Sequence, residues 1–291
     1  MDTMNIVCFG FGQVAKHFIK KINSKNLKIN LTVTSREKSE KKSFDDLDYN
    51  SLQFSESSFD KKLIENLKYS SHILVSIAPV NGEDLVVKNF KNTFDNNKIK
   101  WITYLSATSV YGNHNGDWVN ENSKTNPTSI NGIDRLNAEK SWLDLAQKKG
   151  LPLQILRLSG IYSNQNNILT RLKTGSAKII DKKNQFFSRI HVEDIANILF
   201  RSLQKFKSKE IYNVSDDKPT SPEELILHGS KLLNIEKPEV VNLSTIESEI
   251  VKNFYKDSKK VNNKKMKEFF NYKLKYPTYI EGLDYILNNN I

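Results

Sequence analysis

In the first half of the chain, short apolar runs alternate with longer stretches whose apolar residues recur at helical spacing. Residues 4–10 and 31–35 predict strands, and residues 14–22 between them predict a helix with Val14, Phe18 and Ile22 on one face. Such alternation is typical of βαβ units and a parallel sheet. By the same criteria we expect strands at residues 51–54, 72–78, 99–106, 153–158 and 211–214, and helices at residues 61–69, 83–95 and 133–149.

The second half loses this regular alternation. Residues 193–204 and 221–233 predict helices. The second of these has Ser221 as a cap before Pro222, followed by an acidic first turn. Residues 253–271 are rich in lysine and predict a solvated helix-turn region.

Composition narrows the class of protein. The 291 residues contain one cysteine, which excludes an intramolecular disulfide and favours a reducing, cytoplasmic location. There is no apolar run of about 18 residues, so we expect no membrane span. The first residues lack a basic segment, so we expect no signal peptide.

The net charge of +11 raises the question of a nucleic-acid partner. The 44 basic residues are overwhelmingly lysines spread along the chain, whereas nucleic-acid recognition favours clustered arginine. We therefore interpret the excess charge as solvated surface and expect no nucleic-acid partner. The few arginines then mark positions where a planar guanidinium is needed.

A glycine-rich turn joins the first strand to the first helix. Gly10-Phe11-Gly12-Gln13-Val14-Ala15 has the spacing Gly-x-Gly-x-x-Ala. The first glycine permits the tight turn, the second lets a pyrophosphate approach the backbone, and the small third residue allows close helix packing. A helix N-terminus in this place attracts phosphate, although an ordinary glycine-rich turn has the same letters.

The residues at the end of the second strand indicate whether NAD or NADP would bind. An Asp or Glu at this place binds the ribose 2′-OH of NAD. Here Thr34, Ser35 and Arg36 precede Glu37, and hydroxyls with an arginine suit a 2′-phosphate. We expect NADP, while Glu37 leaves NAD open. The predicted cofactor-binding residues are Gly10, Phe11, Gly12, Gln13, Val14, Ser35, Arg36, Ala78, Arg135 and Ser159.

These features together predict an α/β fold. We expect a Rossmann-type doubly wound parallel sheet. This sheet belongs to an NAD(P)-binding domain formed by residues 1–165 together with the strand near 211–214. Residues 166–291 are expected to form a smaller C-terminal substrate-binding lobe. The boundary is discontinuous, because the last strand returns to the sheet.

Several segments resemble one known family. Residues 104–112 (YLSATSVYG), 157–162 (RLSGIY) and 189–196 (RIHVEDIA) are similar to motifs of the extended short-chain dehydrogenase/reductases, the NAD(P)-dependent epimerase/dehydratase family. Residues 212–214 and 276–283 are similar as well, so the likeness covers nearly the whole chain. It is strongest to an atypical bacterial subgroup without Tyr-x-x-x-Lys.

The resemblance implies a catalytic Ser or Thr, a Tyr that exchanges a proton with the substrate, and a Lys that lowers the pKa of the Tyr. In the family's register these positions are Ala107, Asn131 and Arg135. Asn cannot relay a proton as a phenol does, and Arg does not readily release one. The resemblance therefore does not imply ordinary dehydrogenase chemistry.

Other residues are candidates for that chemistry. Tyr111 has an alternative interpretation as a packing aromatic, and His191 as a structural histidine; no metal site is predicted, because the histidines lack metal-ligand spacing. Arg157 and Arg189 would either hold an anion or pair with carboxylates. The predicted catalytic residues are Ser106, Thr108, Tyr111 and Arg135, and the predicted substrate residues are Asn131, Arg157, Tyr162, Arg189 and His191.

Two functions follow as hypotheses. The first is an NAD(P)-dependent oxidoreductase or epimerase of altered mechanism, acting on an unknown small polar substrate. The second is a non-catalytic NADP-binding sensor or scaffold, which the three replaced catalytic positions favour. The resemblance also implies a homodimer through a helix equivalent to residues 133–149, although Trp142 and Leu145 on this helix are equally explained as core.

Overall fold

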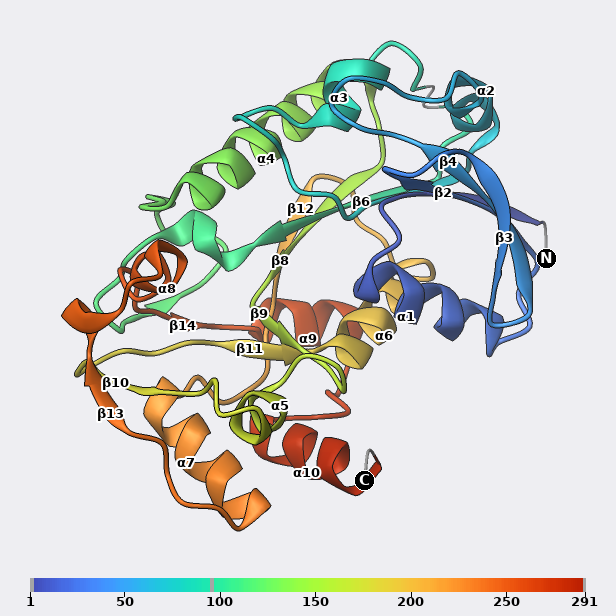
Figure 1. Cartoon of the computed structure of the whole chain (residues 1–291). Helices are drawn as coiled ribbons and strands as arrows, with labels where there is room; N and C mark the ends of the chain where they lie inside the picture. The colour runs from blue at the N-terminus through green and yellow to red at the C-terminus, as the bar shows by residue number, and fades with distance from the viewer. Residues whose placement is uncertain (1–2, 95–96, 290–291) are drawn as a thin grey trace. The chain divides into compact units, whose positions relative to one another are not determined.

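The computed structural model describes residues 3–94 and 97–289. Its main sheet has eight strands in the order β12-β8-β6-β5-β1-β2-β4-β3 (Figure 1). Strand β1 pairs in parallel with β2 and β5, β5 with β6, and β2 with β4, whereas β3 is antiparallel to β4. The strands are β1 Met4–Phe9, β2 Ile29–Ser35, β3 Glu40–Phe44, β4 Leu47–Gln53, β5 His72–Val75, β6 Trp101–Ala107, β8 Leu153–Leu158 and β12 Glu210–Val214.

Helices cover both faces of this sheet, which confirms the predicted Rossmann-type α/β fold. On one face Val7 and Phe9 pack with residues of α2, α3 and α4, such as Phe90 and Trp142. On the other face Phe18 of α1 stacks on Trp101 at 5.8 Å between ring centroids. The helices are α1 Gln13–Asn23, α2 Lys62–Tyr69, α3 Leu85–Phe90, α4 Ile130–Lys149 and α6 Val192–Ser202.

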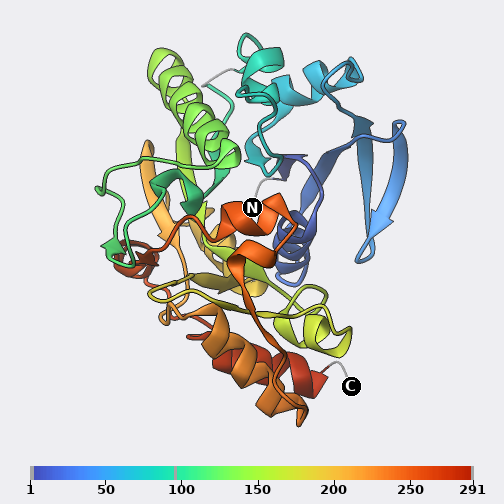
Figure 2. The same cartoon turned by 60° about the vertical axis from the view of Figure 1, so that its left-hand side comes forward.

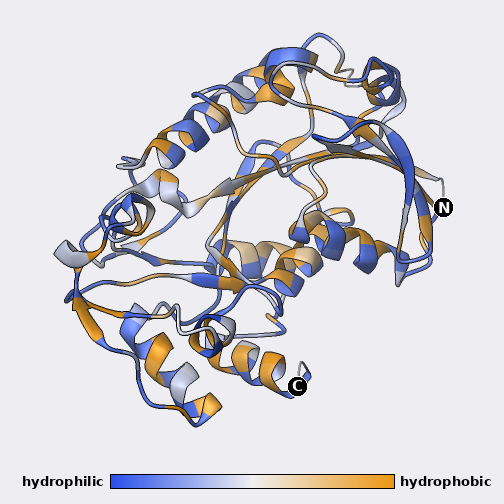
Figure 3. Ribbon diagram, in the orientation of Figure 1, coloured by the Kyte–Doolittle hydropathy of each residue, from blue (hydrophilic) through white to orange (hydrophobic). Residues whose placement is uncertain are grey.

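One-sided burial explains why these helices form where the sequence predicts them. In α1 the residues Val14, Ala15, Phe18, Ile19 and Ile22 are buried, and the polar residues between them face solvent. Figure 3 shows the mixture of hydrophilic and hydrophobic residues along α1 and α4 that such burial requires.

The chain groups into two compact units. The first consists of the chain up to Ser106, together with Ile133–Arg157 and Ile195–Tyr212. The second consists of Ala107–Gly132, Leu158–Asp194 and the chain from Asn213 onward. The domain limit near residue 165 stays a prediction.

The second unit contains short strands in pairs and a small helical core. Tyr162 packs there with residues of α5, α7 and α10, among them Leu169, Ile226 and Leu283. Its pairs are β9 with β11, β10 with β13, and β7 with β14. The elements are η1 Thr108–Tyr111, β7 Trp118–Val119, β9 Gly160–Tyr162, α5 Ile168–Lys173, β10 Ile179–Asp181, β11 Arg189–His191, α7 Pro222–Leu233, β13 Val240–Asn242, η2 Leu243–Thr245, α8 Glu249–Phe254, β14 Lys260–Val261, α9 Lys264–Phe270 and α10 Tyr279–Asn289.

Three predicted elements need correction. The hairpin β3–β4 was not expected; Figure 2 shows it as the two blue strands at the edge of the sheet. Helix α3 is shorter than predicted, since it starts after the cap Asp84 and ends at Phe90, and the predicted end at residue 95 lies outside the described residues. Residues 253–271 are not simply solvated, because Val261, Met266 and Phe270 are buried.

None of the helices in residues 3–94 and 97–289 combines the length and apolar character that a membrane crossing requires.

Candidate functional site

The glycine-rich turn has the geometry that its sequence predicts. Gly10 has φ +88°, a conformation that favours glycine, and a Cβ there would lie 2.8 Å from Ser76 Oγ. Two neighbouring strands hold this turn: Gly10 N donates to Thr34 Oγ1 at 2.9 Å, and Ser76 Oγ donates to Phe9 O at 2.9 Å. The turn therefore has a fixed shape within the sheet.

The start of α1 is open. Gly12 is the N-cap residue, no side chain caps the helix, and its first turn has no acidic residue. A Cβ at Gly12 would have no heavy atom within 4 Å. By contrast, Asp84, Asn167 and Ser221 cap α3, α5 and α7 with their side chains. The backbone N–H groups at the start of α1 thus face open space, which fits a dinucleotide pyrophosphate.

The other residues predicted at this turn have different surroundings. Val14 is buried in the core, so only its backbone can serve a ligand. The Phe11 ring packs against Tyr49, 5.1 Å between centroids, and Gln13 accepts a hydrogen bond from the His17 ring at its carbonyl. Ala78 is exposed beyond the end of β5.

At the end of β2, Ser35 and Arg36 occupy the position where the second ribose of a dinucleotide is recognised. Ser35 Oγ accepts from Glu37 N at 3.2 Å and turns the chain out of the strand. Arg36 is exposed and has no ion pair within the described part of the chain. Glu37, in contrast, has its carboxylate 2.9 Å from Lys42 Nζ.

Arg135 lies one turn into α4, four residues after Asn131. Its Nη1 donates to Leu105 O at 2.6 Å and to Ile77 O at 3.4 Å, and to the Tyr104 hydroxyl at 3.3 Å. These contacts hold the guanidinium at the carboxyl ends of β5 and β6, the edge where ligands of open α/β sheets bind. Burial raises the pKa of Tyr104, so its phenol stays protonated.

Arg135 is thereby brought next to two other predicted residues of the first unit. Ala78 follows Ile77, and Ser106 follows Leu105 in the chain. The Ser106 hydroxyl is buried and has no hydrogen-bond partner in the described residues. Such an oxygen is available to a ligand that reaches the strand end.

Arg157 has a buried partner. Its Nε and Nη2 donate to the two carboxylate oxygens of Glu139 at 3.0 and 2.7 Å, and both side chains are at most 5% exposed. A bidentate pair with this geometry satisfies the carboxylate and fixes α4 against β8. Of the two roles expected for Arg157, pairing with a carboxylate is therefore the one that the structure forms, and the partner is Glu139.

In the second unit, Tyr111 is fully buried at the end of η1. Its hydroxyl donates to Asn213 Oδ1 at 2.7 Å, while Asn213 N donates to Glu121 Oε1 at 2.8 Å. This environment matches the interpretation of Tyr111 as a packing aromatic. Thr108, at the other end of η1, is partly exposed.

Tyr162 and His191 are brought together by the pairing of β9 with β11. They are register partners, with ring centroids 5.1 Å apart. His191 Nδ1 accepts from Glu193 N at 3.3 Å at the start of α6, and the ring is buried. Burial raises the pKa of Tyr162. Both side chains are thus integral to the packing of the second unit.

Partly buried Arg189 and buried Asp216 are joined through the backbone. Arg189 Nη1 donates to Phe187 O at 3.0 Å, and Asp216 N donates to Arg189 O at 2.6 Å. Burial raises the pKa of Asp216 to about 8, although the nearby Arg189 charge opposes the shift. Asp216 Oδ2 is buried without a partner in the described residues. Ser159, also predicted, has a buried hydroxyl in the same condition.

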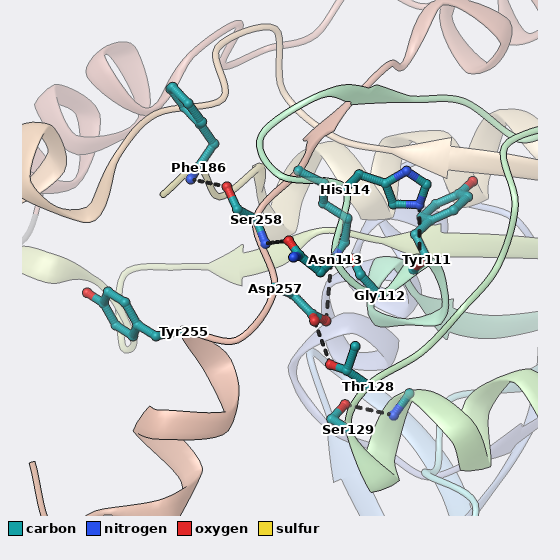
Figure 4. A network of polar contacts seen from close by, with 12 residues as sticks. Tyr111, Gly112, Asn113, His114, Thr128, Ser129, Phe186, Tyr255, Asp257 and Ser258 are labelled. Atoms are coloured by element: carbon teal, nitrogen blue, oxygen red, sulfur yellow. Dashed lines mark hydrogen bonds and ion pairs between the residues drawn. The ribbon is translucent and has the colours of Figure 1, made fainter. Parts of the chain in front are cut away.

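Asp257 and Ser258 contact three loops of the second unit, at Asn113, Thr128 and Phe186 (Figure 4). Thr128 Oγ1 donates to Asp257 Oδ1 at 2.5 Å, and Ser258 N donates to Asn113 Oδ1 at 2.9 Å. Lys259 Nζ donates to Gly112 O at 2.9 Å, and burial lowers its pKa. These bonds fix the loop before α4, on whose first turn Asn131 is exposed.

Lys42, Glu139, Asp216, Asp257 and Lys259 were not predicted as site residues. Glu139 binds Arg157, Asp257 binds Thr128 and Lys259 binds Gly112, all through tertiary contacts. For Lys42 a local signal existed, because Glu40 lies two residues away and so on the same side of a strand. Residues 3–94 and 97–289 contain no group of three His, Cys, Asp or Glu side chains arranged to hold a metal ion.

The NAD dependent epimerase/dehydratase family matches residues 7–215 of the chain. A solved structure of a functionally unknown conserved protein from Silicibacter pomeroyi is 29% identical, with 99% of each chain covered and a TM-score of 0.85. No curated protein matches the chain.

Two further solved structures share the fold at lower identity. UDP-glucuronic acid 4-epimerase from Bacillus cereus, in complex with NAD, is 15% identical over 99% of each chain, with a TM-score of 0.75. dTDP-glucose 4,6-dehydratase from Bacillus anthracis, in complex with NAD, is 18% identical over 98% of this chain and 96% of its own, with a TM-score of 0.74.

Proposed function

The chain belongs to the NAD dependent epimerase/dehydratase family, and from this premise we propose that it binds a nicotinamide dinucleotide at the start of α1. The observation that carries the proposal is the uncapped helix N-terminus behind Gly12, with no acidic residue in its first turn. The epimerase and the dehydratase with the same fold are both in complex with NAD, which supports it.

The proposed dinucleotide is NADP, with NAD as the alternative. Support comes from Ser35 and Arg36 at the end of β2, where an exposed guanidinium and a hydroxyl suit a 2′-phosphate. Phe11, Gln13, Val14 and Ala78 are assigned to the same site through the turn and the end of β5. A bound dinucleotide would supply hydride transfer.

We assign the protein an oxidoreductase or epimerase activity of altered mechanism on a small polar substrate. Asn131 and Arg135 replace the tyrosine and lysine that the family uses, so the proton must come from another group. Arg135 acts as a cation that the Leu105 and Ile77 carbonyls hold in place. Ser106 and Thr108 supply hydroxyls, and we leave Tyr111 out of the catalytic set because its hydroxyl donates to Asn213 in the core.

Substrate binding is assigned to the second unit. Arg189 is the proposed anion-binding residue there, because its side chain is only partly buried and forms no ion pair within the described part of the chain. Burial also raises the pKa of the neighbouring Asp216. Asn131, exposed on the first turn of α4, is the second proposed substrate residue. Tyr162 and His191 are assigned to support of Arg189, because they pack together where β9 pairs with its strand β11. Arg157 is held by Glu139 in the first unit and is left out of this set.

Calorimetric titration with NADP, NADPH, NAD and NADH tests the proposal. The wild-type chain should bind at least one of them, and Gly12→Ala should weaken that binding at least about tenfold, because a methyl group enters the space of the phosphate. The substitution adds no clash in the free protein, so melting should change little. Absence of binding to all four nucleotides would overturn the proposal.

A second candidate function is a non-catalytic NADP-binding sensor or scaffold. The burial of the Tyr111 hydroxyl, together with the lack of a phenol at position 131, favours it. A panel of nucleotide sugars, carbonyl compounds and hydroxy acids separates the two functions. Turnover that is lost in Thr108→Ala excludes the sensor, whereas cofactor binding without turnover of any class supports it.

A further inference from the structure

The hairpin β3–β4 directly follows Arg36 and Glu37 in the chain. Its turn has Asp45 and Asp46 at positive φ, 55° and 60°, as both central residues of a type I′ hairpin turn require. Strand β4 pairs in parallel with β2, with Ser35 opposite Gln53. The hairpin therefore extends the sheet beside the strand end that recognises the second ribose.

Aromatic contacts attach this hairpin to the glycine-rich turn. The Phe11 ring lies 5.5 Å from Phe44 of β3 and 5.1 Å from Tyr49 of β4, measured between centroids. Lys16 Nζ lies 5.9 Å from the centroids of both Phe11 and Phe44. Because these residues lie in one compact unit, the hairpin has a defined position relative to the proposed phosphate site.

Lys42 lies on the same side of β3 as Phe44, and its register partner on β4 is Tyr49. Its ammonium is 2.9 Å from Glu37 Oε2 and 2.8 Å from Glu40 Oε1. Lys42 thus pairs with the Glu37 carboxylate, which follows Arg36 in the chain, and shares its charge with Glu40. Lys41 points to the other side of the strand and is exposed.

We propose that Lys42 selects a dinucleotide with a 2′-phosphate over one without it. A 2′-phosphate has close to two negative charges near neutral pH and is repelled by a free carboxylate. With Glu37 and Glu40 both held by Lys42, no carboxylate pairs with Arg36 in the described residues, and its guanidinium is left to bind that phosphate. Without Lys42, Glu37 is free to accept hydrogen bonds from a ribose diol, the arrangement that favours NAD. The inference rests on the proposed function and adds the residue that sets its cofactor choice.

The test compares Lys42→Glu with Lys41→Glu in fluorescence titrations with NADPH and NADH. Both variants change the net charge equally, so long-range electrostatics are matched. Lys42→Glu should weaken NADPH binding by about tenfold or more while changing NADH binding by about twofold at most. Lys41→Glu should leave the ratio of the two affinities within about twofold of wild type.

An exposed ion pair contributes little to folding, so Lys42→Glu should stay folded, and Lys42→Met serves as a second variant that adds no negative charge. In Lys42→Met, the further change Glu37→Gln should restore part of the NADPH preference, because the freed carboxylate is removed. An unchanged affinity ratio in Lys42→Glu, or an equal shift in Lys41→Glu, would overturn the inference while cofactor binding stands. Failure of the wild-type chain to bind either nucleotide would instead overturn the proposed function.

Discussion

Removing the charge of Glu139 should destabilise the whole chain far more than removing both members of the ion pair. Glu139→Gln keeps the shape of the side chain but leaves Arg157, 5% exposed at its side chain, without its carboxylate. Breaking a buried pair in this way costs about 3–5 kcal/mol. With an unfolding entropy of about 2.1 cal/mol/K per residue, the melting temperature should fall by about 5–8 °C.

The double variant Glu139→Gln/Arg157→Met supplies the internal control. Met restores apolar volume and removes the stranded charge, so the double variant should be more stable than Glu139→Gln alone. Urea unfolding followed by circular dichroism gives both free energies of unfolding. A loss of unfolding free energy below about 1 kcal/mol in Glu139→Gln would refute this reasoning. So would a double variant whose loss equals the sum of the losses in Glu139→Gln and in Arg157→Met alone.

Three other outcomes are expected. Burial lowers the pKa of His72 from 6.5 to about 4. As the pH falls, the unfolded chain therefore takes up a proton on His72 before the folded chain does. The contribution of His72 to the free energy of unfolding is complete above pH 6.5 and declines by on the order of 3 kcal/mol toward pH 4. In urea titrations across this range His72→Gln should show the shallower decline, and parallel profiles would contradict the assignment. Tyr111→Phe removes the hydroxyl that donates to Asn213 Oδ1 at 2.7 Å. It should lower the free energy of unfolding by about 1–2 kcal/mol and leave the cofactor affinity unchanged. Loss of turnover without loss of stability would return Tyr111 to the catalytic set. Gly282→Ala places a Cβ 2.0 Å from the Tyr162 hydroxyl oxygen, so thermal melting should show a loss of about 1–3 kcal/mol, and an unchanged melting curve would contradict the packing described.

The parts of the fold that follow from local pattern could be predicted from the sequence. Strand β8 has the predicted bounds Leu153–Leu158, because it is buried along its whole length and Pro152 precedes it. The N-terminus of α7 was equally readable, since Ser221 caps it by accepting from Glu224 N. The predicted strand at residues 51–54 covers only the buried end of β4. Strand β3 and the start of β4 were missed because they are polar and the Asp45-Asp46 turn lacks the usual glycine.

The candidate site divides in the same way. The glycine turn could be predicted because its conformation depends on residues adjacent in the chain. The contact of Thr128 with Asp257 could not, because the proximity of these residues depends on the assembled fold. The pairing of Lys42 with Glu37 and Glu40 joins residues close in the chain, but it follows only once residues 40–44 are known to form a strand. In the lysine-rich segment 253–271, the Lys259 side chain is only 11% exposed, and the sequence does not distinguish it from the exposed lysines around it.

The alternation of the chain between its two units has a consequence for its synthesis. Strand β8 needs β12 as its outer neighbour, yet β12 begins only at Glu210. At about 5–20 residues per second, a translating ribosome leaves the outer edge of β8 without its partner for several seconds. During that interval the nascent chain exposes unpaired strand hydrogen-bonding groups, which other nascent chains can bind. Chaperone cover during translation should therefore matter more for this protein than for one whose sheet is completed in chain order.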